Sequence, residues 1–149
     1  MGENKLPQIS PSTNLKKHIR DVVSSAYENA RVGLGNDEYA YVRKRIHAKL
    51  RSLEASGTAW VRDMGRHGAA LYALYIDYAR GNLELTLLVA EASVAALFYL
   101  VNPYDVIPDH VPGDGYLDDA HVMNLAVRIV ESQHPGLFQK YLNQIDTGL

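Results

Sequence analysis

Apolar residues recur along most of this chain at the three- and four-residue spacing of amphipathic helices, and no segment alternates like a strand for long. Ser12 or Thr13 can cap a first helix, which a pair of glycines would end. The expected inward stripe of this helix comprises Leu15, Ile19, Val22, Ala26 and Ala30, with Val23 and Tyr27 alongside. Asn36 or Asp37 can cap a second helix. The stripe of the second helix comprises Tyr39, Val42, Ile46, Leu50 and Leu53.

Two longer helical segments follow. We expect a third helix over about 59–80, although Gly65 and Gly68 weaken its middle by about 1 kcal/mol each relative to alanine. Glycines in the middle of a helix often allow another backbone to approach closely. A fourth helix over about 83–101 is the most apolar segment of the chain, and this predicts a helix at the centre of the core.

A loop rich in proline and aspartate, over 102–115, separates the fourth helix from a fifth that begins near Leu117. A short terminal helix is expected over 137–145. The predicted fold class is therefore all-α, a compact bundle of five to six helices with this loop between helices four and five. We expect a flexible N-terminal arm at 1–11 and a single helical domain at 12–149.

The segment around the fourth and fifth helices contains a long motif, ALFYLVNPYDVIPDHVPGDGYLDD, over residues 96–119. This motif resembles the signature of the YkvA-like family of bacterial domains of unknown function, and the similarity covers about residues 70–130. The residues in register with that signature are Pro103, Asp105, Ile107, Pro108, Asp109, Pro112, Gly115, Asp118 and Asp119. The chain departs from the family's apolar or small residues at His110, Gly113, Asp114 and His121. The resemblance also implies a link to membranes, because members of the family are often labelled membrane proteins.

A structural interpretation gives the residues of the motif roles in a rigid corner. Asn102 can cap a turn that begins at Pro103, where the missing N–H costs nothing, and Pro108 can stop that turn. Asp118 and Asp119 lie at the expected start of the fifth helix, where a carboxylate favours the positive end of the helix dipole. On this interpretation the motif seals one end of the helical core.

A second interpretation is a metal or catalytic centre. Converging carboxylates repel one another unless a cation or a shared proton compensates, and oxygen ligands select hard cations such as Mg²⁺, Mn²⁺ or Ca²⁺. The candidate ligands are Asp105, Asp109, Asp118, Asp119, His110 and His121. The corresponding function is a carboxylate-metal-dependent enzyme of hydrolytic type, with a histidine as ligand or base. The spacing matches neither an EF-hand nor a zinc peptidase, and we expect no other cofactor.

The charge is divided unevenly along the chain. Residues 1–80 contain 13 Lys and Arg against 8 Asp and Glu, whereas residues 81–149 contain 2 against 9. An interaction could therefore use an acidic face near the motif or the basic second helix. The cations of that helix are Arg43, Lys44, Arg45, Lys49 and Arg51. Nucleic acid is disfavoured as a partner, because the isoelectric point is about 6.3 and only Tyr41 could stack on a base.

The expected function is a non-enzymatic interaction or accessory module of a bacterial cell, with another protein as partner. The absence of cysteine and of a signal-peptide pattern predicts a cytoplasmic location. The fourth helix is short for a membrane span, and Glu91 lies near its centre. The alternatives are the metal-dependent enzyme, a membrane-peripheral protein and an immunity- or antitoxin-like binder.

Overall fold

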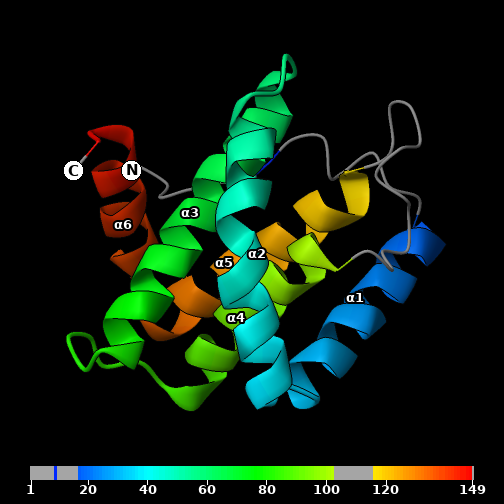
Figure 1. Ribbon diagram of the computed structural model, residues 1–149. Coiled ribbons are helices and arrows are strands. Elements are labelled where there is room, and N and C mark those ends of the chain that lie inside the picture. Colours follow the sequence, from blue (N-terminus) through cyan, green and yellow to red (C-terminus); the bar gives the residue numbers. More distant parts are fainter. Residues whose placement is uncertain (1–8, 10–16, 103–115, 149) are drawn as a thin grey trace, which may run out of the picture.

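The computed structural model describes residues 9, 17–102 and 116–148, and these residues form a compact bundle of six helices without strands (Figure 1). In chain order the helices are α1 (Lys17–Val32), α2 (Asn36–Glu54), α3 (Ala59–Ala79), α4 (Leu87–Val101), α5 (Leu117–Gln133) and α6 (Leu137–Asp146). The sequence-based prediction of an all-α fold is confirmed. The expected arm at 1–11 stays a prediction, because only Ile9 of that segment is described.

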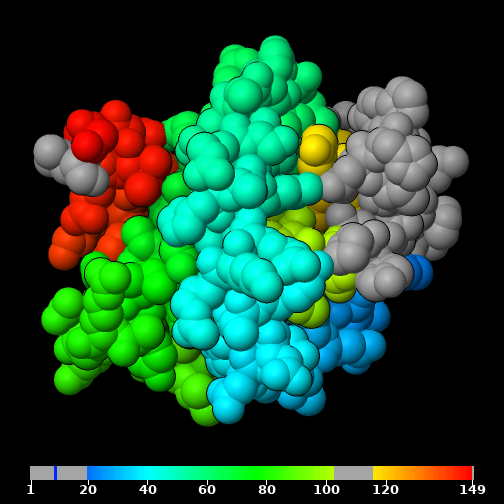
Figure 2. All heavy atoms as spheres, in the orientation of Figure 1, coloured from blue at the N-terminus to red at the C-terminus, as the bar shows by residue number. Residues whose placement is uncertain are grey.

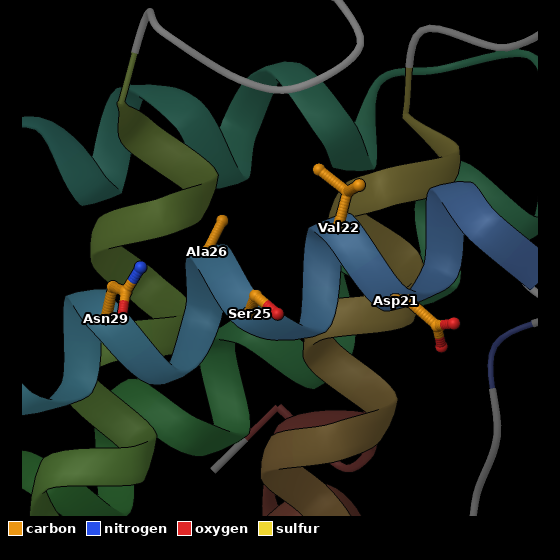
Figure 3. A pocket seen from close by; sticks show the side chains of 5 residues that line it. All are labelled: Asp21, Val22, Ser25, Ala26 and Asn29. Atoms are coloured by element: carbon orange, nitrogen blue, oxygen red, sulfur yellow. The ribbon is translucent and has the colours of Figure 1, made fainter.

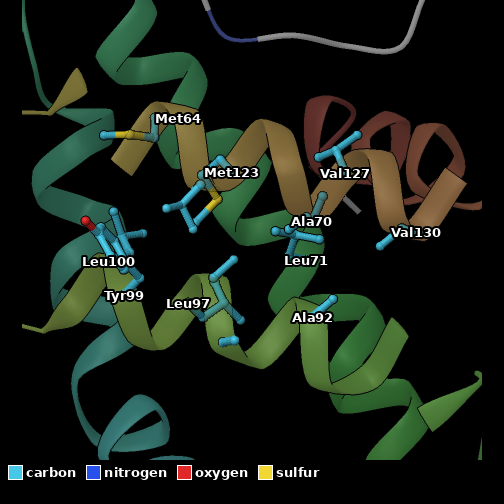
Figure 4. Close-up of a cluster of buried hydrophobic side chains, with 14 of the residues drawn as sticks. Met64, Ala70, Leu71, Ala92, Leu97, Tyr99, Leu100, Met123, Val127 and Val130 are labelled. Atoms are coloured by element: carbon cyan, nitrogen blue, oxygen red, sulfur yellow. The ribbon is translucent and has the colours of Figure 1, made fainter. Parts of the chain in front are cut away.

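Helix α4 lies at the centre of the bundle. It packs against α1, α2, α3 and α5, and ten of its 15 residues are buried. Because apolar side chains project from every side of α4, most of the helix can be covered all round, and only Leu87 and Leu88 in its first turn are exposed among its large apolar residues. Figure 4 shows Leu97 and Leu100 of α4 with Leu71 of α3 and Met123 of α5 in one continuous cluster.

Two helices begin at residues other than those expected. Helix α4 starts at Leu87 because Thr86 caps it, with the Thr86 hydroxyl accepting a hydrogen bond from the Val89 N–H at 3.3 Å. The N-cap of α2 is Gly35, so the prediction of Asn36 or Asp37 as its cap is wrong by one residue or two. Glycine has no side chain to cap with, and the Glu38 carboxylate instead accepts the Gly35 N–H at 2.7 Å.

The buried face of α1 is centred on Val23 and Tyr27, both about 1 % exposed or less. Val22, which we placed in the inward stripe, is 54 % exposed, and this part of the prediction is wrong. The Tyr27 hydroxyl donates a hydrogen bond at 2.8 Å to the backbone carbonyl of Ala92 in α4. That contact turns Tyr27, and Val23 one turn before it, towards the core. Val22 precedes Val23 in the helix and therefore faces away from the core.

Helices α2 and α3 approach closely where α3 contains glycine. A Cβ atom added at Gly68 would lie 2.8 Å from Cδ2 of Leu50, and one added at Gly65 would lie 3.1 Å from Cβ of Leu53. Both distances are shorter than ordinary van der Waals contact. The expectation that these glycines admit a neighbouring helix is therefore confirmed.

Polar contacts from α3 hold α6 in place. The Tyr141 hydroxyl donates to the Asp77 carboxylate at 2.5 Å, and burial together with this bond raises the pKa of Tyr141 to about 12. The Arg66 guanidinium donates to both carboxylate oxygens of Asp146, at 2.8 and 2.7 Å. The α3 residue His67, which follows Arg66, is only 4 % exposed, and its ring meets that of Phe138 in α6 edge to face. Burial lowers the pKa of His67 to about 4.

Candidate functional site

Only the second half of the proline- and aspartate-rich motif lies within the described residues. Asp118, Asp119 and His121 begin α5. The remaining candidates fall in residues 103–115, outside the described part of the chain, and their roles stay predictions. They are Pro103, Asp105, Ile107, Pro108, Asp109, His110, Pro112 and Gly115.

Asp118 and Asp119 lie in the first turn of α5, where the sequence places them, and both are buried, at 0 % and 1 % exposure. The Tyr99 hydroxyl, near the end of α4, donates a hydrogen bond at 3.1 Å to Oδ2 of Asp118. A carboxylate at this position also interacts favourably with the N-terminus of the helix. Asp118 therefore joins the start of α5 to the end of α4. Neither carboxylate contributes to an exposed acidic face near the motif, which weakens that candidate surface.

His121 lies one turn further along α5 and contacts α1. Its Nε2 atom is 2.9 Å from the hydroxyl oxygen of Ser24, and either group can be the donor, depending on the tautomer. Burial lowers the pKa of His121, as do the charges of Arg128 and Arg20. Within the described residues, no three His, Asp or Glu side chains are placed to hold a metal ion. The metal site stays a prediction, because it depends on residues at 103–115.

The start of α5 also contacts α2. The ammonium group of Lys49 lies 5.2 Å from the ring centroid of Tyr116, the residue before α5 begins. This is within the range of a cation–π interaction. Together with the contacts of Asp118 and His121, it connects the first turns of α5 to α2, α4 and α1. The described half of the motif is thus part of the packing between helices.

The outward side of α2 has a concentration of basic groups. We call Arg43, Lys44, His47 and Arg51 the basic face of α2; all four are exposed. Among the described residues, none of the four forms an ion pair with a carboxylate, whereas Arg31 and Arg66 of the neighbouring helices do. Figure 2 shows α2, in cyan, across the side of the molecule that faces the viewer. The fold therefore presents this face to solvent without neutralising it.

Tyr41, the one candidate for stacking on a nucleobase, already has partners in the molecule. The Arg45 guanidinium carbon lies 4.1 Å from the centroid of its ring, and the ring meets Phe98 of α4 edge to face at 5.7 Å. A base would have to displace Arg45 to stack there. This agrees with the sequence-based argument against nucleic acid, which stays a prediction.

One open depression lies on the outer side of α1, with a volume of about 440 Å³. It is lined by Asp21, Val22, Ser25, Ala26 and Asn29. Figure 3 shows these side chains spread along the helix and pointing in different directions. Because a ligand site needs polar groups that converge, this depression is a weak candidate.

Of the polar contacts between distant segments that our sequence-based interpretation did not predict, two involve residues of α5 beyond its first turn. One is the bond between Ser24 and His121. In the other, the Asn124 side chain accepts the N–H of Ile9 at 2.8 Å and donates to its carbonyl at 3.1 Å. Asn124 is 4 % exposed and Ile9 is 1 % exposed. The available signal was an asparagine beside the apolar stripe of the fifth helix, because a buried amide requires hydrogen-bond partners.

Comparison with known proteins supports the resemblance of the motif. Residues 92–125 match the model of a family described as "Protein of unknown function (DUF1232)". The chain is 37 % identical over 57 residues to the "Uncharacterized membrane protein YkvA" of Bacillus subtilis (strain 168), which covers 38 % of this chain and 50 % of that protein. The chain thus spans about half the length of this curated relative. No solved structure matches the chain significantly.

That relative is named a membrane protein, and the structure adds one finding. Among the described helices, none combines the length and apolar character that crossing a bilayer requires. The matched segment runs from the buried centre of α4 through the motif to the middle of α5. Over this segment the chain is therefore similar to the YkvA-like family of bacterial domains of unknown function.

Proposed function

We propose that this chain is a non-enzymatic interaction module and that the basic face of α2 attaches it to an anionic membrane surface. The observation that carries the proposal is that the described structure leaves these exposed basic groups without a carboxylate partner. The metal-dependent enzyme has no comparable support among the described residues.

The basic face follows from the helical spacing of α2. Arg43, His47 and Arg51 recur every four residues, and Lys44 lies seven residues before Arg51, so all four share one side of the helix. A different side of α2 carries the buried stripe that begins at Val42, and the packing of this stripe in the core turns the basic face outward. Grouped like charges repel one another and attract a surface of opposite sign.

A membrane is the acidic surface that the observations favour. A curated relative of the matched segment is named a membrane protein, and no described helix is suited to crossing a bilayer. Peripheral electrostatic attachment is consistent with both findings. Basic residues near an anionic leaflet contribute about 1 kcal/mol each, so the three permanent cations of this face would give weak, reversible and salt-sensitive attachment.

Vesicle flotation tests the proposal with a matched pair of variants. Lys44→Gln with Arg51→Gln removes one lysine and one arginine from the basic face. Arg80→Gln with Lys140→Gln removes the same two residue types from exposed positions elsewhere. We expect the wild type to bind vesicles containing phosphatidylserine and to ignore pure phosphatidylcholine. The α2 variant should bind about 30-fold more weakly, whereas the control should resemble the wild type.

Three outcomes would overturn the proposal. The first is no binding to anionic vesicles at low salt. The second is equal loss in both variants, which would indicate a general effect of net charge. The third is binding to an acidic polypeptide or to RNA without binding to vesicles, which would replace the membrane with that partner.

A further inference from the structure

A second group of basic residues lies where α1 meets α5, away from the basic face of α2. The bond between Ser24 and His121 brings one side of each helix together. Arg20 lies one turn before Ser24 on α1, and Arg128 lies two turns after His121 on α5. Helical spacing therefore places both arginines on the sides of α1 and α5 that face each other. We call Arg20, Ser24, His121 and Arg128 the α1–α5 polar seam.

The two arginines of the seam are not neutralised. Within the described part of the chain, neither Arg20 nor Arg128 forms an ion pair. Arg128 is exposed, and Arg20 and His121 are half-buried. Both guanidinium groups act electrostatically on His121, as does Asp21 with the opposite sign. The seam thus combines two fixed positive charges with an imidazole and a hydroxyl group.

We propose that the α1–α5 polar seam is a binding site for a phosphate group of the monoester type. Guanidinium groups present planar pairs of N–H donors that match the oxygens of phosphate. Ser24 and His121 can supply the remaining hydrogen bonds to a tetrahedral anion, in exchange for the bond that they now make to each other. The group could belong to a free phosphomonoester or to a lipid headgroup, and the two sources share this chemistry.

Binding at the seam should depend on pH through His121. A bound anion would offset the charges of Arg20 and Arg128, and would therefore raise the pKa of His121 towards or above its ordinary value. The protonated ring then donates a hydrogen bond to the anion. Asp21 on α1, the one described acidic group that acts on His121, acts in the same direction as the anion. Because phosphate itself gains a proton as the pH falls through this range, the dependence is measured with sulfate, which keeps its charge and should bind more tightly at about pH 6 than at about pH 8.

The test is an NMR titration of the full isotope-labelled chain with inorganic phosphate, at constant ionic strength. We expect saturable shifts at the Ser24 amide and the His121 ring at millimolar phosphate. Arg20→Gln and Arg128→Gln should each weaken binding about tenfold or more, whereas Arg80→Gln, an exposed arginine elsewhere, should not. The amide spectrum of each variant shows whether it has folded.

Two further arms complete the test. Lys44→Gln with Arg51→Gln should leave phosphate binding unchanged. The phosphate site and the membrane attachment through α2 are thus tested by different variants, and either proposal can fail while the other holds. Stronger binding to vesicles of phosphatidic acid than of phosphatidylglycerol, lost in Arg128→Gln, would identify a lipid source, and no preference would identify a soluble one. An absence of saturable shifts at about 10 mM phosphate, or equal affinity in the Arg20, Arg128 and Arg80 variants, would overturn the inference.

Discussion

Replacing Asn124 by alanine should release Ile9 from the bundle. The Asn124 side chain makes two hydrogen bonds to the Ile9 backbone, at 2.8 and 3.1 Å, in a buried environment. Alanine can make neither bond. An amide group and a carbonyl group left buried without partners would cost about 1–3 kcal/mol each, so Ile9 should detach instead of staying in place.

The cost of detachment can be worked out from its parts. Two hydrogen bonds contribute about 1 kcal/mol each, and burial of the Ile9 side chain contributes about 2 kcal/mol. The freed residue regains about 2 kcal/mol of conformational entropy. Asn124→Ala should therefore lower the free energy of unfolding by about 2 kcal/mol. Ile9→Ala should lower the free energy of unfolding by a similar amount at most, because the variant cannot lose more than the full detachment of residue 9 costs.

A double-mutant cycle, measured by urea denaturation, checks this reasoning. If Ile9 depends on Asn124, the double variant should cost about as much as either single variant, which corresponds to a coupling of about 2 kcal/mol. Hydrogen exchange at the Ile9 amide should become fast in Asn124→Ala. Losses that add to about 4 kcal/mol would refute the reasoning, because Ile9 would then be held by contacts other than Asn124.

Three further predictions concern the core, and a substitution at the exposed Gly57 is the control for one of them. Tyr27→Phe removes the hydroxyl group that binds a carbonyl of α4, and should cost about 1 kcal/mol in urea denaturation. The pKa of His67 is lowered from 6.5 to about 4 by burial, so its contribution to stability is complete above pH 6.5 and is lost as the pH falls towards 4. The free energy of unfolding should fall by about 3 kcal/mol over this pH range. Urea denaturation curves measured at a series of pH values should show this fall in the wild type and not in His67→Leu. Gly65→Ala should lose about 1 kcal/mol, because crowding against Leu53 outweighs the gain in helix propensity. Gly57→Ala, with no atom within 4 Å of the added methyl group, should change stability by less than about 0.5 kcal/mol.

The sequence predicted the helices better than the way they pack. A bundle of five to six helices followed from apolar spacing, because that signal is local. The orientation of α1 was only partly predictable, since Val22 and Val23 both fit an inward stripe and the position of α4 decides between them. The start of α4 was placed early because Leu83 and Leu85 extend the apolar run, whereas the hydroxyl of Thr86 determines where the helix begins.

In the candidate sites, too, local features could be predicted from the sequence and features that depend on packing could not. Asp118 and Asp119 were placed correctly at the start of α5, because the helix dipole is a local effect. The basic face of α2 was visible as a group of cations, but their lack of acidic partners depends on how the other helices pack. The bond between Ser24 and His121 joins residues 97 positions apart, and no local pattern predicts such a pair.

A single reporter on α2 would test the central claim most directly. The chain has no cysteine, so Ala48→Cys introduces a unique thiol beside the basic face, and Asn143→Cys introduces one on an exposed position of α6. Each can be labelled with a fluorophore that responds to its environment. Anionic vesicles should change the emission of the label at position 48, salt should reverse the change, and the label at position 143 should be unaffected. An equal response at both positions, or a response at position 143 alone, would contradict attachment through α2.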